Sequence, residues 1–338
     1  MRTEQAGPHR AVFTYQLPLL KPVRIAGVER SHVSGFLLRE ETGGTVRWSN
    51  AAPLDGYSRE SRADVGDALR ACVAGRISWS DVAGRHASVR WAMSGWSMHG
   101  WAPAEGFIPL ARLISGGTPH AVLEELADAV RDGYRVVKIK VGGRLLEEDM
   151  ALAREVIDQL PVGVKVRFDA NRAWSVEQAV RFAHAATSDR LDYLEEPLAD
   201  PSGYPAFEQQ TETPWALDES LVQVPTLRDG PWQRLVAYVL KPSLIGGLTD
   251  LLPLVEEARR LGRRTVVSAM YESGIGIIHA ATLAAAIAPA EAAGLDTYGA
   301  LAADVLVPGL DVAGGKMRVP PLAELARRVD LNRLESWT

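Results

Sequence analysis

The chain has 338 residues, of which 47% are hydrophobic and 23% charged, a composition and length ordinary for a globular protein with a large and a smaller domain. Its formal net charge of -5 argues against nucleic acid or a membrane surface as a partner, since both usually bind a basic patch. The single cysteine, Cys72, excludes an intrachain disulfide and favours a reducing, cytoplasmic setting.

The first third of the sequence predicts a small α+β domain. The opening residues lack the long apolar run of a signal peptide. Alternating apolar and polar residues then predict three strands, with a hairpin turn at Gly43 and Gly44. Helical spacing follows the strands. The predicted strands are 12–19, 33–41 and 44–52, and the predicted helices are 60–75 and 86–98.

A different rhythm begins near residue 106, where strands alternate with helices about every 25 residues. This alternation indicates a parallel sheet, and seven or eight units in a row favour a closed barrel. The predicted class is therefore α/β, a (β/α)7β TIM-like barrel of residues 106–310 with an N-terminal α+β capping domain of residues 1–105. The last segment, 311–338, is expected to pack back on the capping domain.

The predicted strand RVVKIKV, residues 135–141, carries two lysines within an apolar run. Side chains alternate across a strand, so Lys138 and Lys140 point to the same face. Two solvated lysines at the edge of a sheet would be the ordinary explanation. That explanation does not suit a strand in the middle of a barrel, so we expect both ammonium groups to face its interior.

Polar residues end the neighbouring strands in the same phase. In barrels of this kind the functional side chains lie at the carboxyl ends of the strands. Three carboxylates that converge there require a counter-cation, and oxygen ligands without cysteine or histidine suggest Mg2+ or Mn2+. The residues follow one another at intervals of 23 to 29 positions: Lys140, Asp169, Glu195, Asp218 and Lys241.

This arrangement predicts a reaction on a small-molecule carboxylate substrate. A metal that binds the substrate carboxylate, with a base beside it, allows a proton to be removed from the adjacent carbon. We expect Lys140 to be the base and Lys138 to lower its pKa toward neutrality, because like charges disfavour each other. Lys241, from the opposite side of the barrel, is expected to flank the other face of the substrate.

The motifs K-x-K, D-x-N, E-E-P, D-E-S and K-P followed by Gly-Gly resemble those of the enolase superfamily, in its muconate lactonising subgroup. The resemblance spans nearly the whole chain. It implies that Asp169, Glu195 and Asp218 bind the metal, that Lys140 is the acid and base, and that Lys241 is the second lysine. Residues 51–61 resemble the loop of the capping domain that shields the site.

Residues next to the expected ligands, and others that the resemblance places near the substrate, complete the predicted site. Three adjoin the expected ligands and are expected to support them: Asn171, Glu196 and Glu219. Four are expected to contact the substrate: Arg167, Ser268, Gly246 and Gly247. Where family members often carry Gly-Glu before the capping loop, this sequence has Ser49-Asn50, so the contacts of that loop are left open.

The motifs imply a lyase that dehydrates a hydroxycyclohexadiene carboxylate. Racemisation of an N-acylamino acid, or epimerisation of a dipeptide, would use the same metal and both lysines. A barrel without catalytic activity is the third alternative, which the intact lysines and carboxylates disfavour. A monomer is favoured, although the sequence does not settle the oligomeric state.

Overall fold

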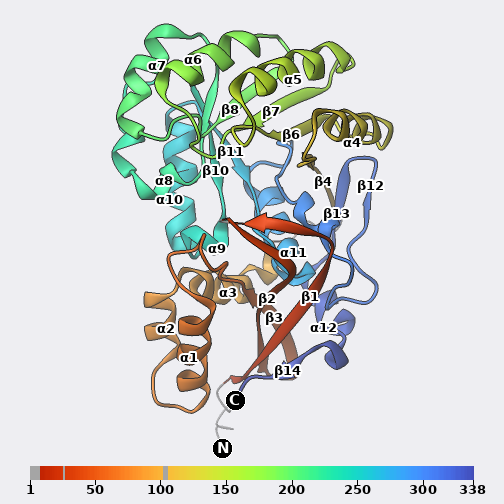
Figure 1. Ribbon diagram of the computed structural model, residues 1–338. Coiled ribbons are helices and arrows are strands. Elements are labelled where there is room, and N and C mark those ends of the chain that lie inside the picture. The colour runs from red at the N-terminus through yellow and green to blue at the C-terminus, as the bar shows by residue number, and fades with distance from the viewer. Residues whose placement is uncertain (1–7, 26, 102–105) are drawn as a thin grey trace, which may run out of the picture.

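A computed structural model describes residues 8–25, 27–101 and 106–338 (Figure 1). Its centre is a parallel sheet of seven strands in the order β11-β10-β9-β8-β7-β6-β5. The strands run in chain order around the sheet, as a barrel requires. Their bounds are β5 Ala111–Ile114, β6 Val136–Lys140, β7 Lys165–Asp169, β8 Leu191–Glu195, β9 Trp215–Leu217, β10 Leu235–Leu240 and β11 Arg264–Val267.

The segment around residues 293–294 closes this sheet into a barrel. It forms parallel bridges to both edges, Leu110 with Ala293 and Ser268 with Gly294. The amide of Ala111 donates to the carbonyl of Ala293 over 2.9 Å, and the amide of Gly294 donates to Val267 over 2.9 Å. The eighth position is thus filled by a short extended segment, and the predicted (β/α)7β barrel is confirmed.

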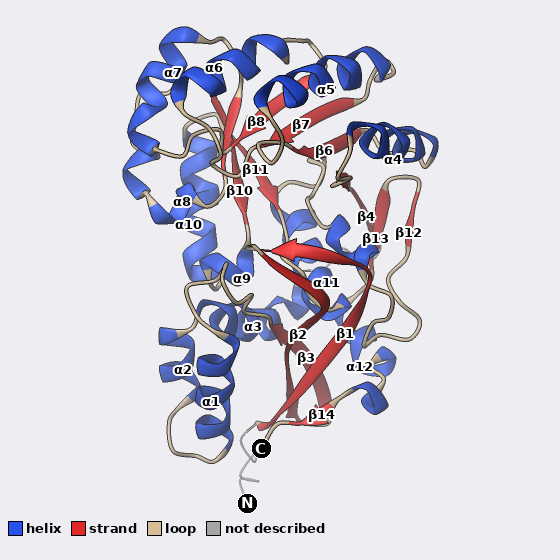
Figure 2. Cartoon of the chain, viewed as in Figure 1, coloured by secondary structure: helices blue, strands red, loops and turns tan. Residues whose placement is uncertain are grey.

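Helices pack on the outside of the barrel strands (Figure 2). Their sequences carry the expected end signals: Thr118 accepts from the amide of Ala121, and Ser175 and Gln178 form a capping box. The bounds are α4 Pro119–Arg131, α5 Leu146–Gln159, α6 Val176–Ala185, α7 Tyr204–Gln210, α8 Ser220–Gln223, α9 Pro242–Ile245, α10 Leu248–Arg260 and α11 Gly274–Ile287. Each helix in the described parts of the chain is too short or too polar to cross a bilayer.

The first third folds as an antiparallel sheet with helices beside it, in the strand order β14-β1-β2-β3. The turn at Gly43 and Gly44 joins β2 to β3 with positive φ at both glycines, as predicted. A helix that the sequence did not predict, α2, follows α1. The bounds are β1 His9–Ile25, β2 Val28–Thr42, β3 Thr45–Ala51, α1 Arg62–Val73, α2 Trp79–Arg85 and α3 Ala87–Ser97.

The C-terminal segment serves both halves of the molecule. Its last strand, β14 (Glu335–Ser336), pairs with β1, so the chain returns to the first sheet. The preceding hairpin of β12 (Val312–Ala313) and β13 (Lys316–Val319) instead pairs with β4 (Gly106–Pro109), at the start of the barrel. The short α12 (Leu325–Arg328) lies between them. The domain limits 1–105 and 106–310 stay a prediction.

Helix α11 lies between the two halves, which explains its unusual composition. It is apolar on all sides, and every residue from Gly274 to Ala284 is buried. A helix with no polar face must be enclosed. One side of α11 packs on the barrel at β11, and another packs on β3 of the antiparallel sheet. The apolar run that the sequence shows here is therefore the contact between the two halves of the protein.

Candidate active site

A cavity of about 600 Å³ lies at the carboxyl ends of the barrel strands. The barrel contributes Lys138, Lys140 and Lys241 to its wall. The first sheet and the loop after β3 cover it with residues 22–25, Leu54 and Tyr57. The loop that the resemblance assigns to shielding the site therefore does lie over it.

Lys138 and Lys140 both point into this cavity, as strand alternation predicts. The alternate residues Val137 and Ile139 are fully buried in the apolar core. Lys138 Nζ lies 2.8 Å from Asp169 Oδ2 and 2.7 Å from Glu195 Oε1. The register of β6 against β7 sets this geometry, because it pairs Lys140 with Asp169 across the sheet.

Lys140 is closer to the cavity than Lys138. Its Nζ lies 2.6 Å from Asp169 Oδ2 and 2.7 Å from Asn171 Oδ1. The side chain of Lys140 is 39% exposed, against 13% for Lys138. Lys140 is thus the lysine of this strand that a substrate in the cavity can contact more freely.

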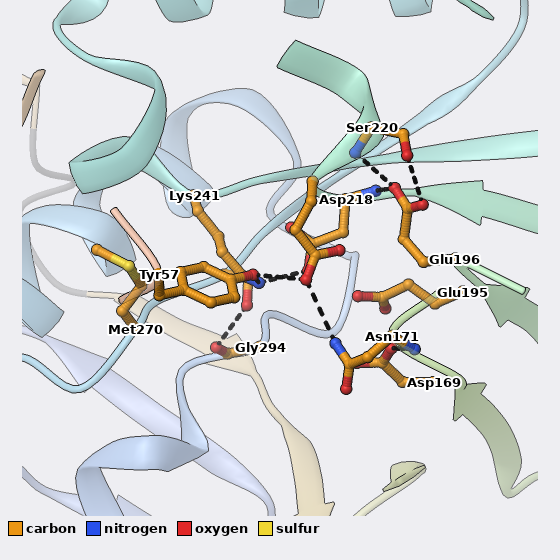
Figure 3. Close-up of polar contacts among 12 residues, drawn as sticks. Tyr57, Asp169, Asn171, Glu195, Glu196, Asp218, Ser220, Lys241, Met270 and Gly294 are labelled. Atoms are coloured by element: carbon orange, nitrogen blue, oxygen red, sulfur yellow. Dashed lines mark hydrogen bonds and ion pairs between the residues drawn. The ribbon is translucent and has the colours of Figure 1, made fainter. Parts of the chain in front are cut away.

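Lys241 reaches the site from the opposite side, directly after β10. Its Nζ forms an ion pair with Asp218 Oδ2 and donates to the hydroxyl of Tyr57. Figure 3 shows these three side chains converging. Asp218 follows β9, so the two expected positions at the ends of β9 and β10 meet.

Glu196 supports this arrangement from behind. Its Oε1 accepts from the amides of Asp218, over 2.7 Å, and Ser220, over 2.8 Å. Its Oε2 accepts from the Ser220 hydroxyl over 2.7 Å. Burial, and then the neighbouring Glu219, raise the pKa of Glu196 to about 7. Glu196 therefore fixes the backbone that presents Asp218, which fits its expected supporting role.

Three residues at these strand ends have left-handed backbone conformations. They are Asn171 with φ 44°, Arg172 with φ 61° and Glu196 with φ 43°. Asparagine adopts this conformation more readily than most residues, whereas arginine and glutamate are strained in it. Backbone strain of this kind clusters at functional sites.

At the site, burial and the neighbouring charges shift the pKa values of the carboxylates and lysines. Burial works against the charged form of Asp169, but Lys138 and Lys140 outweigh it and hold the pKa of that carboxyl well below its usual range. Burial likewise opposes the charged form of Lys138, and Asp169 and Glu195 raise its pKa above the ordinary value. For Asp218, burial raises the pKa well above its usual range, opposed by Lys241 and reinforced by Glu219 and Glu195.

The structure places a carboxylate between the ammonium groups of Lys138 and Lys140. The sequence predicts direct repulsion between two ammonium groups. In the structure Asp169 Oδ2 contacts both, at 2.8 Å and 2.6 Å. A carboxylate between two cations screens each from the other. Sequence spacing places the two lysines on one face but does not show what lies between them.

The carboxylates suit a divalent cation by their chemistry. Within the described parts of the chain, three buried carboxylate oxygens at the site have no hydrogen-bond partner: Glu195 Oε2, Asp218 Oδ1 and Glu219 Oε2. Unpartnered buried oxygens are costly, and such donors are the ligands of Mg2+ and Mn2+. Among the residues that the structure describes, no three acidic, histidine or cysteine side chains are close enough together to enclose a metal ion. Lys138 pairs with Asp169 and Glu195, and Lys241 pairs with Asp218, so a cation would have to replace these ion pairs.

The expectation that Arg167 contacts the substrate is wrong. Arg167 precedes Asp169 by two residues on the same face of β7, so it lies deeper in the barrel. It is 1% exposed, donates to Asp192 over 2.7 Å and to the carbonyl of Ala292 over 2.8 Å, and pairs with Glu291. It does not line the cavity of the lysines; it lines another, at the opposite ends of the strands.

The expectation for Gly246 and Gly247 is also wrong. Neither glycine lines the cavity. The amide of Gly247 donates to Asp250 Oδ2 over 2.9 Å, and Arg90 of α3 donates to the same oxygen over 2.6 Å. The single turn of α9 carries the chain away from the site, and the pair packs against the first domain. Gly246 has φ 127°, which explains why glycine is required there.

Ser268 does lie in the cavity wall, where its hydroxyl donates to the carbonyl of Gly294 over 3.1 Å. Its contact with a substrate stays a prediction. Tyr57 and Arg24, which also line the cavity, were not singled out from the sequence. The tyrosine within the shielding loop was the one signal for Tyr57, and nothing in the sequence around Arg24 indicates a site.

Comparisons with known proteins show which family this chain resembles. Residues 121–323 match the family model described as enolase C-terminal domain-like. The o-succinylbenzoate synthase of Vibrio cholerae serotype O1 is 32% identical, covering 89% of this chain and 92% of the relative. The o-succinylbenzoate synthase of Enterobacter sp. is 30% identical, and the match covers 85% of this chain and 89% of the relative.

A solved structure has the same fold. It is a dipeptide epimerase from Enterococcus faecalis complexed with Mg and the dipeptide L-Leu-L-Tyr, with a TM-score of 0.80 and 19% identity. The match covers 96% of this chain and 99% of the epimerase. Identity at this level supports the shared fold alone.

Proposed function

This chain belongs to the enolase superfamily, and on that premise we propose that it is an o-succinylbenzoate synthase. The reaction is the syn dehydration of 2-succinyl-6-hydroxy-2,4-cyclohexadiene-1-carboxylate to 2-succinylbenzoate, in menaquinone biosynthesis. The cofactor is Mg2+, with Mn2+ as a substitute. The relatives that cover about nine tenths of this chain at 30% identity or more support this choice of substrate.

One observation carries the chemistry. Lys140 and Lys241 line a single cavity from β6 and from the end of β10, on opposite sides of the carboxylates of Asp169, Glu195 and Asp218. A substrate that reaches the carboxylates must therefore lie between two amines. This geometry suits the removal of a proton next to a carboxylate.

In the proposed mechanism Lys140 Nζ takes the proton from the carbon that bears the substrate carboxylate. The electron pair of that C–H bond forms an enediolate. The C–O bond of the neighbouring hydroxyl then breaks, and Lys140 returns its proton to the departing oxygen, which leaves as water. Both transfers occur on one face of the ring, because one side chain performs both. The ring becomes aromatic.

Lys241 serves as a cation in this mechanism. It flanks the enediolate from the opposite face and stabilises the negative charge that develops there. Its side chain is 11% exposed, so water screens that charge little. Lys138, more deeply placed than Lys140, balances the charges of Asp169 and Glu195.

Asp169, Glu195 and Asp218 would hold the metal ion. When bound, a divalent cation supplies positive charge next to the substrate carboxylate. Glu196 holds the backbone of Asp218 in place, and Asn171 orients Asp169 by donating its backbone N–H to Asp169 Oδ1 over 3.0 Å. The residues around the ligands therefore restrict their movement.

Racemisation of an N-acylamino acid, or epimerisation of a dipeptide, is the second candidate. The two lysines on opposite sides of one cavity favour it, since each can reach one face of a carbon atom. Lys241→Arg keeps the positive charge but not the basicity. An epimerase loses proton exchange from one face in this variant, whereas a dehydratase keeps part of its activity.

The experiment that tests the proposal follows aromatisation of the succinyl-hydroxycyclohexadiene carboxylate by ultraviolet absorbance, with Mg2+ and with a chelator. Rapid turnover that the chelator abolishes supports the dehydratase. Absence of turnover in the presence of Mg2+ contradicts it and directs the search to dipeptides and N-acylamino acids. Absence of both activities and of Mg2+ binding would point to a barrel without catalysis.

We propose a cytoplasmic location, which suits a single buried cysteine and a small-molecule substrate. The monomer remains the proposed state. Size-exclusion chromatography with light scattering tests it directly.

A further inference from the structure

We propose that Tyr57, from the loop after β3, is a positioning residue for Lys241 and links the two lysines through hydrogen bonds. Its kinetic consequence rests on the proposed function, whereas its geometric content does not. The tyrosine belongs to the first third of the chain, yet its hydroxyl lies among the side chains at the barrel strand ends (Figure 3).

The hydroxyl of Tyr57 has two partners of opposite charge. It accepts from Lys241 Nζ and donates to Glu219 Oε1 over 2.9 Å. The centre of its ring lies 4.8 Å from the same Nζ, within range of a cation–π contact. A phenol has one O–H group to donate, and Tyr57 donates it in the hydrogen bond to Glu219. The oxygen therefore offers Lys241 only a lone pair, which fixes the direction from which the ammonium approaches.

Glu219 extends this contact to the other lysine. Its Oε1 also accepts from Asn171 Nδ2 over 3.3 Å, and Asn171 Oδ1 accepts from Lys140 Nζ over 2.7 Å. A continuous hydrogen-bonded chain thus connects Lys140 to Lys241 around the carboxylates. Four of its members come from the barrel, and Tyr57 is the one that the barrel does not supply.

The loop holds Tyr57 firmly in this position. Its amide donates to the carbonyl of Leu54 over 2.9 Å, forming a turn. Three residues later, the carboxylate of Glu60 accepts from the amides of Ala87, over 2.7 Å, and Ser88, over 2.9 Å, at the start of α3. Arg59 donates to the carbonyl of Val222 in the barrel over 3.1 Å. Tyr57 therefore reaches Lys241 only when this loop is docked on the barrel.

The contact between Tyr57 and Lys241 restrains Lys241 most when a metal ion is bound at the site. Lys241 Nζ contacts Asp218 and Tyr57 in the described part of the chain. If Asp218 turns to a metal ion, Tyr57 is the partner that keeps the ammonium in place. Without its hydroxyl the long lysine side chain gains rotamer freedom, and fewer molecules hold Nζ where the substrate needs it.

The test uses the full chain with Mg2+ and compares Tyr57→Phe with Tyr238→Phe. Tyr238 is a matched control, because its hydroxyl also accepts from a cation, Arg263, and donates to a glutamate, Glu257, over 3.0 Å. It does not line the cavity. We expect Tyr57→Phe to lower kcat about tenfold with little change in KM, as for a lost hydrogen bond to a charged group. Tyr238→Phe should leave both near wild type.

A second readout does not depend on activity. Acetylation of Lys241 by a water-soluble ester, followed by peptide mass spectrometry, should become severalfold faster in Tyr57→Phe, with exposed Lys165 as the internal standard. Unchanged kcat and unchanged labelling would overturn the proposal, as would equal losses in both variants. If Tyr57→Phe does not fold, Tyr57→Leu removes the same hydroxyl. If the wild type dehydrates nothing, labelling alone decides, so the proposed function can fail while the positioning role stands.

Discussion

Replacing Glu272 by glutamine should remove one contribution to the pH dependence of this protein's stability. Glu272 lies between β11 and α11 and is 2% exposed. Its Oε1 accepts from the Ser243 hydroxyl over 2.9 Å, and its Oε2 has no hydrogen-bond partner among the residues that the structure describes. Burial raises the pKa of this carboxyl from 4.5 to about 7, although the hydrogen bond from Ser243 opposes the shift.

The sign and size of the effect follow from this shift. The folded protein binds the proton more tightly than the unfolded chain, so between about pH 4.5 and pH 7 the folded state carries more protons. The contribution of Glu272 to the free energy of unfolding is then fully present below pH 4.5. It falls as the pH rises and levels off above pH 7. With about 1.4 kcal/mol per pKa unit, the loss between pH 5 and pH 8 is about 2.5 kcal/mol. Glutamine does not titrate, so the variant lacks this pH-dependent contribution.

The assay is urea unfolding of the wild type and Glu272→Gln at several pH values from 5 to 8. The difference in unfolding free energy, variant minus wild type, should increase by about 2.5 kcal/mol over this range. With an m-value of about 3 kcal/mol/M, the variant's midpoint should gain about 0.8 M relative to the wild type. A difference that stays constant with pH would refute the reasoning, because it would mean that Glu272 titrates alike in both states.

Three further predictions concern the barrel. Lys140→Ala should lower turnover by about 10^2- to 10^4-fold, while Lys165→Ala, at the exposed opposite end, should not; near-normal turnover would remove Lys140 as the base. Asp218→Asn should weaken Mg2+ binding at least about tenfold, and unchanged affinity by calorimetry would exclude it as a ligand. Arg167→Met removes one partner of Asp192 and should lower the free energy of unfolding by about 3 kcal/mol, with KM unchanged. A raised KM at full stability would contradict the structural role of Arg167.

The sequence predicts the barrel because local patterns encode it. β-Branched runs of strand length, helices with end signals and a repeat near 25 residues all favour alternating strands and helices. Strand alternation also predicts which side chains face the interior, so Lys138 and Lys140 could be placed together from the sequence alone. Asp169 could be placed beside Lys140 because parallel strands of one barrel end at a common rim.

The wrong predictions of substrate contact, for Arg167 and for Gly246 and Gly247, have a common origin. Arg167 and Asp169 have the same alternation, so the pattern that places both on the inner face does not show that one lies deeper than the other. Gly246 and Gly247 come soon after the end of β10, but α9 lies between and leads them toward α3. Depth within a barrel and the direction of a loop depend on contacts between segments far apart in the chain, which local spacing does not contain.

The sequence by itself thus determined the barrel, the three carboxylates and the two lysines that flank them. Tertiary structure decided how these charges pair, as in the contact of Asp169 with both Lys138 and Lys140. It also brought Tyr57 to Lys241 across 184 positions of the chain. The physical reason is that strand periodicity is set by neighbouring residues, whereas such a contact forms only when segments far apart in the chain pack together.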